Sequence, residues 1–173
     1  MQIIHNFDIS PREYHERGTL NNFPEINICP CCSYPKRLIR HGFYWRHAVF
    51  FHQYFRIPIL RFRCLSCDKT FSILPDFLLP YFQHSLEFVL ECLREYFLKC
   101  TSKVYHQLLQ FYRRRFLRNL NLISAFFRDK GYRGIVPEKN KAIKLLEMIG
   151  AFPKAKTLAK RFYDHFNRNF MAN

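Results

Sequence analysis

Two pairs of cysteines share one spacing along the chain, Cys29-x-x-Cys32 and Cys64-x-x-Cys67. Four thiolates at this spacing are typical ligands of a tetrahedral zinc site, and such a site has no open coordination position. A closed site of this kind stabilises a fold and performs no chemistry itself. The sequence therefore predicts one structural Zn²⁺, held by these four cysteines in a ribbon whose strands fill the interval between the pairs.

Other interpretations of the cysteines fit the sequence less well. A redox-active pair would require a βαβ context, which neither pair has. A disulfide framework would suit a secreted domain, but residues 1–5 lack an apolar signal segment and the count of seven cysteines is odd. We therefore expect a reducing, cytoplasmic environment. Cys31 and His41 remain alternative ligands near the first pair, whereas Cys92 and Cys100 fall in a helical pattern and are predicted to be buried.

The chain is strongly basic, with 28 lysines and arginines against 13 acidic residues and a net charge of +15. Such an excess favours a polyanionic partner, and nucleic acid is the partner we expect. A solubilising surface, an acidic protein or an anionic membrane are the alternatives. No apolar stretch is long enough to span a membrane, so we expect no membrane insertion.

Aromatic residues are abundant, with 20 phenylalanines and 10 tyrosines. Most of them are predicted to form cores, because these side chains bury the most apolar surface in a small domain. Stacking on unpaired bases is the alternative, and it keeps RNA open as a partner. Trp45 is predicted to pack in a core or within the ribbon, with stacking on a base as the alternative.

The pattern of residues predicts an α+β protein with three parts. Residues 1–27 form an N-terminal arm, with one short helix over 11–17. Residues 28–81 form the four-cysteine zinc ribbon, an antiparallel β structure. Residues 82–173 form an all-helical, helix-turn-helix-like domain.

Within the ribbon, strands are predicted over 37–46 and 55–63, where apolar and basic residues alternate. Gly42 is expected to mark a β-bulge or a close approach of another backbone segment. Pro58 cannot donate a hydrogen bond to a neighbouring strand, so the second strand is expected to lie at a sheet edge there. Residues 70–81 are predicted to be an apolar connector.

Apolar residues recur every three or four positions in the second half of the chain, which is typical of amphipathic helices. Helices are predicted over 85–99, 102–128, 138–149 and 154–170, the first capped by Ser85 or His84 and the third ended by Gly150. Whether residues 101–128 form a helix-turn-helix or one long helix stays open at this point.

Four arginines cluster on the predicted helix over 102–128: Arg114 and Arg118 lie opposite its apolar stripe, and Arg113 and Arg115 flank them. A helix fits the major groove of DNA, and arginine can bind guanine edges or phosphates. The ribbon carries further basic residues that could form a second strip along the DNA backbone, namely Lys36, Arg37, Arg40, Arg46, Arg56, Arg61 and Arg63. The alternative is a solvated basic face on a packed helix.

Three segments, Cys29–Cys32, Ile39–Tyr44 and Arg61–Ser72, follow a plan that resembles the N-terminal zinc ribbon of bacterial insertion-element transposases and of transposase-like proteins of mobile elements. The similarity covers roughly residues 28–128. In those families the ribbon precedes a helix-turn-helix, and together they recognise the DNA ends of the element. The resemblance therefore implies a DNA-binding region whose recognition helix spans about residues 107–121.

Transposases of this type continue into a catalytic domain with an Asp-Asp-Glu metal site. Too few residues follow Arg128 for that domain, and no Ser-His arrangement or phosphate-binding glycine loop is present. We expect a non-catalytic, zinc-containing DNA-binding protein of mobile-element, plasmid or phage origin, acting in the bacterial nucleoid as a regulator or DNA-end-recognition factor. An RNA-binding ribbon and a protein–protein adaptor are the alternatives, and a homodimer or a recombinase partner would suit such a protein.

Overall fold

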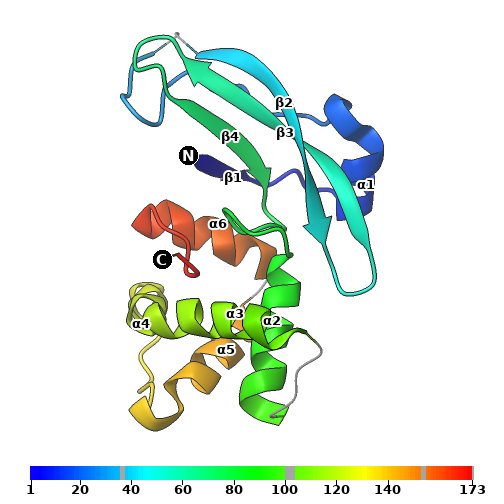
Figure 1. The fold of residues 1–173 in the computed structure, drawn as a ribbon. Coiled ribbons are helices and arrows are strands. Elements are labelled where there is room, and N and C mark those ends of the chain that lie inside the picture. Colours follow the sequence, from blue (N-terminus) through cyan, green and yellow to red (C-terminus); the bar gives the residue numbers. More distant parts are fainter. Residues whose placement is uncertain (36–37, 100–103, 153–154, 173) are drawn as a thin grey trace. The chain divides into compact units, whose positions relative to one another are not determined.

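The computed structural model of the chain describes residues 1–35, 38–99, 104–152 and 155–172. It shows an α+β protein that divides into two units, Met1–Gln83 and His84–Asn173 (Figure 1). The predicted fold class is confirmed at this level. Unit 1 contains a four-stranded sheet and unit 2 contains helices. No helix in the described ranges has the length and apolar character needed to cross a membrane.

The sheet of unit 1 has the strand order β1-β4-β3-β2. Its strands are β1 (Gln2–His5), β2 (Leu38–Val49), β3 (Tyr54–Cys64) and β4 (Thr70–Pro75). β1 pairs in parallel with β4, and the other two pairings are antiparallel. β4 occupies much of the stretch that was expected to be a connector, because Thr70–Phe71 continue the sheet directly after the second cysteine pair.

The long β2–β3 hairpin agrees with the sequence pattern. Its register shifts between Arg40 and Phe43, and Gly42 has a φ of +86°. The bulge predicted at Gly42 is thus confirmed, because glycine adopts this φ without the steric penalty of a side chain. Beyond the bulge the pairing is regular from Phe43 opposite Leu60 to Val49 opposite Tyr54.

The N-terminal residues belong to the sheet unit and do not form a separate arm. Helix α1 (Pro11–Arg17) and the 3₁₀ turn η1 (Gly18–Leu20) follow β1, so the short helix was placed correctly. β1 escaped sequence-based prediction because it is four residues long and pairs with a strand far along the chain.

Helix α1 covers an open edge of β3. β4 pairs with β3 only at Arg61–Arg63, so among the described residues no strand lies beside Pro58 on that side. There the Tyr14 hydroxyl donates a hydrogen bond of 3.0 Å to the Pro58 carbonyl. The predicted edge position of Pro58 therefore holds locally, although β3 is a central strand of the sheet.

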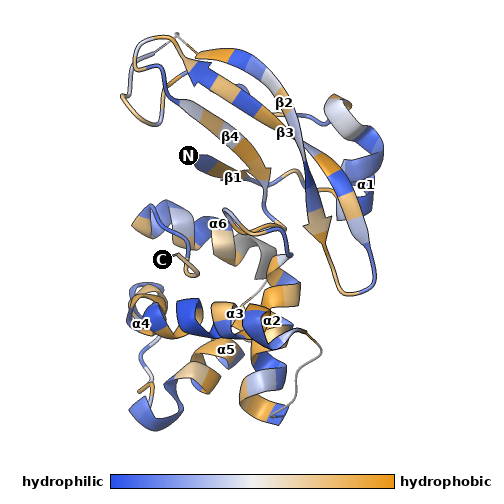
Figure 2. Ribbon diagram, in the orientation of Figure 1, coloured by the Kyte–Doolittle hydropathy of each residue, from blue (hydrophilic) through white to orange (hydrophobic). Residues whose placement is uncertain are grey.

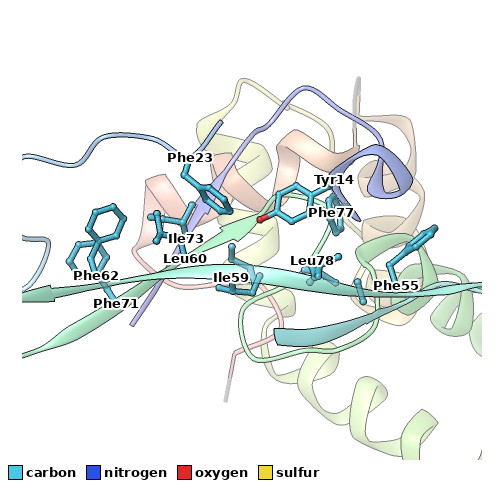
Figure 3. Close-up of a cluster of buried hydrophobic side chains, with 13 residues drawn as sticks. Tyr14, Phe23, Phe55, Ile59, Leu60, Phe62, Phe71, Ile73, Phe77 and Leu78 are labelled. Carbon is cyan, nitrogen blue, oxygen red and sulfur yellow. The ribbon is translucent and has the colours of Figure 1, made fainter. Parts of the chain in front are cut away.

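An apolar core joins these elements. Tyr14 from α1 packs edge-to-face on Phe77, with ring centroids 5.7 Å apart, and Ile59 of β3 is fully buried in the same cluster (Figure 3). Phe62 of β3 and Phe71 of β4 stack in parallel with centroids 5.4 Å apart. The abundant aromatic residues of unit 1 thus serve largely as core.

The helices of unit 2 are α2 (Leu86–Arg94), α3 (His106–Arg118), α4 (Leu120–Asp129), α5 (Lys141–Ala151) and α6 (Ala155–Phe166). α2 continues as a π-helical turn over Glu95–Lys99, and a 3₁₀ turn over Glu138–Asn140 leads into α5. Figure 2 shows hydrophobic residues concentrated on α2 and hydrophilic residues on the visible side of α3. The Ser85 hydroxyl accepts a hydrogen bond of 3.1 Å from the Phe88 amide, which confirms Ser85 as the cap of α2.

Sequence-based boundaries in unit 2 need three corrections. The stripe over residues 102–128 is broken at Asn119, whose φ of −101° and ψ of 6° leave helical geometry. Its buried side-chain amide donates to the Arg115 carbonyl and to the Ala172 carbonyl, both at 2.8 Å. Gly150 lies inside α5, and the last helix ends at Phe166.

Candidate metal centre and basic helix face

The four predicted cysteines meet in unit 1. Their sulfur atoms all lie within 4.8 Å of one another, and the sulfurs of two pairs, Cys29–Cys67 and Cys32–Cys64, are 3.8 Å apart. Four sulfurs around one ion at a metal–sulfur distance of about 2.3 Å would be separated by about 3.8 Å in a tetrahedron. The cluster therefore has the dimensions to hold one metal ion.

The two cysteine pairs form turns with the same hydrogen bonds. The amide of Ser33 donates to the Cys29 carbonyl at 2.8 Å, and the amide of Asp68 donates to the Cys64 carbonyl at 2.9 Å. The amides of Cys29 and Cys64 in turn donate to the carbonyls five residues later, at 3.1 Å and 3.0 Å. Because both turns have this geometry, each directs its two sulfurs to a common point.

Backbone amides also stabilise the first sulfur of each pair as a thiolate. The amides of Cys31 and Ser66 each lie 3.4 Å from the sulfur of the first cysteine in their own turn. Hydrogen bonds from the backbone of Cys67 and then Ser66 lower the pKa of Cys64 to about 6, against the opposing effect of burial. A thiolate is the form of cysteine that binds a metal ion.

The alternative ligands do not join the cluster. Neither Cys31 nor His41 belongs to the group of metal-ligating atoms. The Cys31 sulfur instead lies 4.0 Å from the Met1 sulfur, at an exposed position. Cys92 is buried in α2, as predicted, and Cys100 lies outside the described residues. Four thiolates complete a tetrahedral set, so this centre can support the fold of unit 1 but offers no position for a substrate.

The basic helix face lies on α3 in unit 2. A surface hollow of about 540 Å³ is lined by His106, Gln107, Gln110, Phe111, Arg114, Arg115 and Arg118. Arg114 and Arg118 are one helical turn apart and exposed. On the opposite side of the same helix, Leu109, Tyr112 and Phe116 are buried. The helix thus presents polar and basic side chains to solvent while its apolar side packs.

The four arginines of the predicted cluster do not act alike. Arg113 does not line the hollow. Its guanidinium lies 5.6 Å from the Tyr96 ring, and it donates a hydrogen bond of 3.3 Å to Gln110, which does line the hollow. Arg115 lines the hollow but also donates to the Met171 carbonyl at 3.1 Å, so it has a structural contact as well. Only Arg114 and Arg118 are both exposed and directed to this face.

Gln107 and Gln110 belong to this face and were not singled out from the sequence. Gln107, Gln110 and Arg114 follow one another at the three- and four-residue spacing of one helix face, and this spacing is the signal that could have identified the two glutamines. The arginines are dense in the sequence, but the helical spacing of the residues that line one side of α3 is the more informative pattern.

The ribbon arginines do not form one strip. Arg46, Arg61 and Arg63 lie on one side of the β2–β3 hairpin, while Arg40 pairs with Phe62 on the other side. Arg46 is half-buried and donates to the Phe82 carbonyl. Lys36 and Arg37 lie outside the described residues.

Two of the remaining ribbon arginines have local partners. The Arg61 guanidinium lies 4.9 Å from the Tyr44 ring centroid. Arg63 donates to the Asp68 carboxylate at 2.6 Å, within the second cysteine turn. Trp45 was expected to pack within the ribbon, but 48% of its surface is exposed.

Comparison with known proteins places the cysteine pairs in a recurring domain. Residues 29–109 match the model of a domain of unknown function, DUF6431. No curated protein matches the chain, and no solved structure does. The matched segment includes the four cysteines, the β2–β3 hairpin and α2, and it ends within the first turn of α3. Over these residues the chain is therefore similar to DUF6431.

Proposed function

We propose that this protein binds double-stranded DNA through the exposed face of α3 and has no catalytic role of its own. The observation that carries the proposal is the set of side chains on that face, where Gln107, Gln110, Arg114 and Arg118 line one hollow. Arginine forms paired hydrogen bonds with guanine, and glutamine does so with adenine. Both side chains also bind phosphates.

The dimensions of α3 suit this role. The helix spans His106–Arg118, so it is about 20 Å long, and the major groove of B-DNA, about 12 Å wide, admits a single helix. The apolar side of α3 is held by its own unit: the His84 ring lies 6.0 Å from Tyr112, and Arg113 lies over Tyr96. The other side is largely polar, with Phe111 as its exposed ring. A helix of this kind can enter a groove without exposing its core residues.

In this proposal α2 and α3 are the two helices of a helix-turn-helix, with α3 as the recognition helix. Residues 100–103, at their connection, lie outside the described residues. The break at Asn119 separates α3 from α4, so α3 has the length of a single recognition helix. The resemblance to insertion-element transposases supports this assignment and the origin of the chain in a mobile element, plasmid or phage.

The metal in the cysteine centre is proposed to be a structural Zn²⁺, and unit 1 a zinc ribbon. A set of four thiolates with tetrahedral spacing suits zinc, a metal that has no redox chemistry to disturb a structural role. When bound, the ion would fix the two turns against each other. The net charge of +15 then provides the general attraction to a nucleic-acid backbone.

The proposal is tested by fluorescence anisotropy with a labelled duplex of about 30 base pairs at about 150 mM salt. The variant Arg114→Ala with Arg118→Ala is compared with a control that removes the same charge from unit 2, Lys144→Ala with Lys160→Ala. Those lysines form local ion pairs with Glu147 and Asp164. We expect the arginine variant to bind at least about tenfold more weakly and the control to bind nearly as the parent does.

The salt dependence of the same binding curves distinguishes the roles of the arginines. Arginines on phosphates would reduce the log–log salt slope by about one each, whereas arginines on bases would relax sequence preference. Equal weakening in both variants would mean that only total charge matters and would contradict the assignment to α3. Tighter binding to structured RNA than to the duplex would favour the RNA-binding alternative.

A further inference from the structure

A second surface with features of a binding site lies on the β2–β3 hairpin of unit 1. Residues directly opposite each other in antiparallel strands share a face, and alternate residues along each strand share it too. The register places Trp45, His47, Tyr54 and Arg56 on one face, because His47 pairs with Arg56 and the others follow at intervals of two. We refer to these four residues as the hairpin strip.

The hairpin strip faces solvent. Trp45 is 48% exposed and Tyr54 is 70% exposed, and His47 and Arg56 are also exposed. The opposite face of the same segment is buried, since Ala48 and Ile57 have no exposed surface. Trp45 and Tyr54 are therefore not part of the hydrophobic core. They are additional to a core that is already complete on the other side of the hairpin.

The side chains of the strip are arranged in alternation. The Arg56 guanidinium lies 5.3 Å from the Trp45 ring centroid, and the His47 ring lies 5.9 Å from the Tyr54 ring. The distance between the guanidinium and the indole is typical of a cation–π contact. Each aromatic group consequently has a positive or protonatable neighbour beside it, and both ends of the row carry a large ring.

The charge of the surrounding segment is entirely positive. Between Ile26 and Cys67 the sequence contains no aspartate or glutamate, and its cations are Lys36, Arg37, Arg40, Arg46, Arg56, Arg61 and Arg63. An acidic protein or a nucleic acid would both be attracted by this charge. A nucleic acid fits these features better, because each nucleotide combines a negative phosphate with a flat base that can stack on exposed tryptophan and tyrosine.

We propose that the hairpin strip binds single-stranded nucleic acid, with unpaired bases stacked on Trp45 and Tyr54 and phosphates near Arg56. Bases in a duplex are stacked on one another and cannot lie against a protein ring, whereas unpaired bases can. The surface is in unit 1, and the proposed duplex-binding helix is in unit 2, so the two activities rest on different residues. Each can fail without the other.

Trp45 is the single tryptophan of the chain, which makes its fluorescence a direct probe of the strip. The full-length, metal-loaded protein is titrated with oligo-dT and oligo-U of about 20 nucleotides, and with a duplex of the same length. We expect the single strands to quench the emission of Trp45 by stacking and the duplex to leave it nearly unchanged. The DNA and RNA arms identify which backbone is preferred.

Point variants test whether the hairpin strip is the site that binds single strands. Tyr54→Ala should weaken single-strand affinity about tenfold, and Arg56→Gln should weaken it and reduce its salt dependence. Tyr81→Ala removes another exposed ring of unit 1, 74% exposed, and serves as the control that should bind normally. Because Tyr54 and Arg56 are exposed, their variants should fold, and the metal content of each confirms that unit 1 is intact.

The variant Arg114→Ala with Arg118→Ala separates this inference from the proposed function. It should lose duplex binding and retain quenching by single strands. Equal quenching by duplex and single strand would overturn the inference, as would binding by anisotropy without any change in Trp45 emission. Absence of single-strand binding would overturn it as well.

Discussion

Ser33 and Asp68 occupy equivalent positions in the two cysteine turns, and each has a φ of 58°. Each directly follows the second cysteine of its pair, and each amide donates to the carbonyl of the first cysteine. The left-handed conformation is costly for residues with a side chain, although aspartate tolerates it better than most. The metal centre therefore depends on two strained turns of the same design.

Replacing Ser33 with glycine should stabilise unit 1. Glycine adopts a φ of 58° without a steric penalty, so we expect an increase of about 1 kcal/mol in the free energy of unfolding, partly offset by the greater freedom of glycine in the unfolded chain. Urea unfolding of the metal-loaded protein measures the change. Asp68→Gly is the informative comparison, because it also removes the carboxylate that binds Arg63. Its free energy of unfolding should therefore increase by less than that of Ser33→Gly. Equal gains in both variants would show that the Arg63 contact contributes nothing.

Removal of one sulfur ligand should prevent stable folding of unit 1. Cys64→Ser replaces a buried sulfur of the cluster, and a hydroxyl is a poor substitute for a thiolate on zinc. We expect loss of about one bound metal per chain and loss of the folded signal of the sheet, measured by elemental analysis and circular dichroism. Cys31→Ser is the matched control, because its sulfur lies outside the cluster, and it should keep the metal. Full metal content in Cys64→Ser would contradict the four-cysteine assignment.

The sequence was sufficient to identify the cysteine cluster, because the Cys-x-x-Cys spacing within each pair is a local feature that can be read directly from the sequence. The bulge at Gly42 and the cap at Ser85 were predictable for the same reason, because a single residue type determines each. The place of β1 in the sheet was not predictable. Its pairing partner β4 is distant in sequence, and no local pattern specifies a contact of that kind.

The binding faces required the structure. Arg113 and Arg114 are neighbours in sequence, yet one packs on Tyr96 and the other faces solvent. Trp45 would bury well in a core, and only the register of β2 with β3 shows that it lies on the solvent side. Residue type therefore indicates which interactions a side chain can make. Strand pairing and the rotation of the helix determine which of these side chains face solvent and can bind a partner.

Tyr14→Phe should destabilise unit 1 by about 1–2 kcal/mol, because it leaves the Pro58 carbonyl without its donor at the covered edge of β3. Burial of Tyr14, and the proximity of Tyr44, raise the pKa of its hydroxyl, so it remains a donor at every pH at which the protein is handled. Chemical denaturation measures the loss. Tyr54→Phe removes a hydroxyl from an exposed ring and should leave stability unchanged. Similar losses in both would mean that the hydroxyl to Pro58 is not the cause.

Asn119→Ala should release the C-terminal segment from unit 2. The Asn119 amide bonds the carbonyls of Arg115 and Ala172, and Arg115 bonds the carbonyl of Met171. We expect a destabilisation of about 2 kcal/mol and faster hydrogen exchange near residues 169–172. Arg115→Ala should have a partly overlapping effect, so the double variant should be less destabilised than the sum of the two. Strict additivity would indicate that the two side chains hold the segment independently.

Unit 2 should lose stability on acidification through His84. Burial beside Phe88, whose ring lies 4.6 Å away, lowers the pKa of His84 below its ordinary value of 6.5. The unfolded chain therefore binds a proton at a higher pH than the folded chain does, so stability is complete above about pH 6.5 and falls as the pH drops towards the folded pKa. Urea unfolding at pH 7.5 and at about pH 5.5 measures the difference, which His84→Gln should reduce. His52→Gln, at an exposed position in unit 1, is the control. An unchanged pH dependence in His84→Gln would assign the effect to another group.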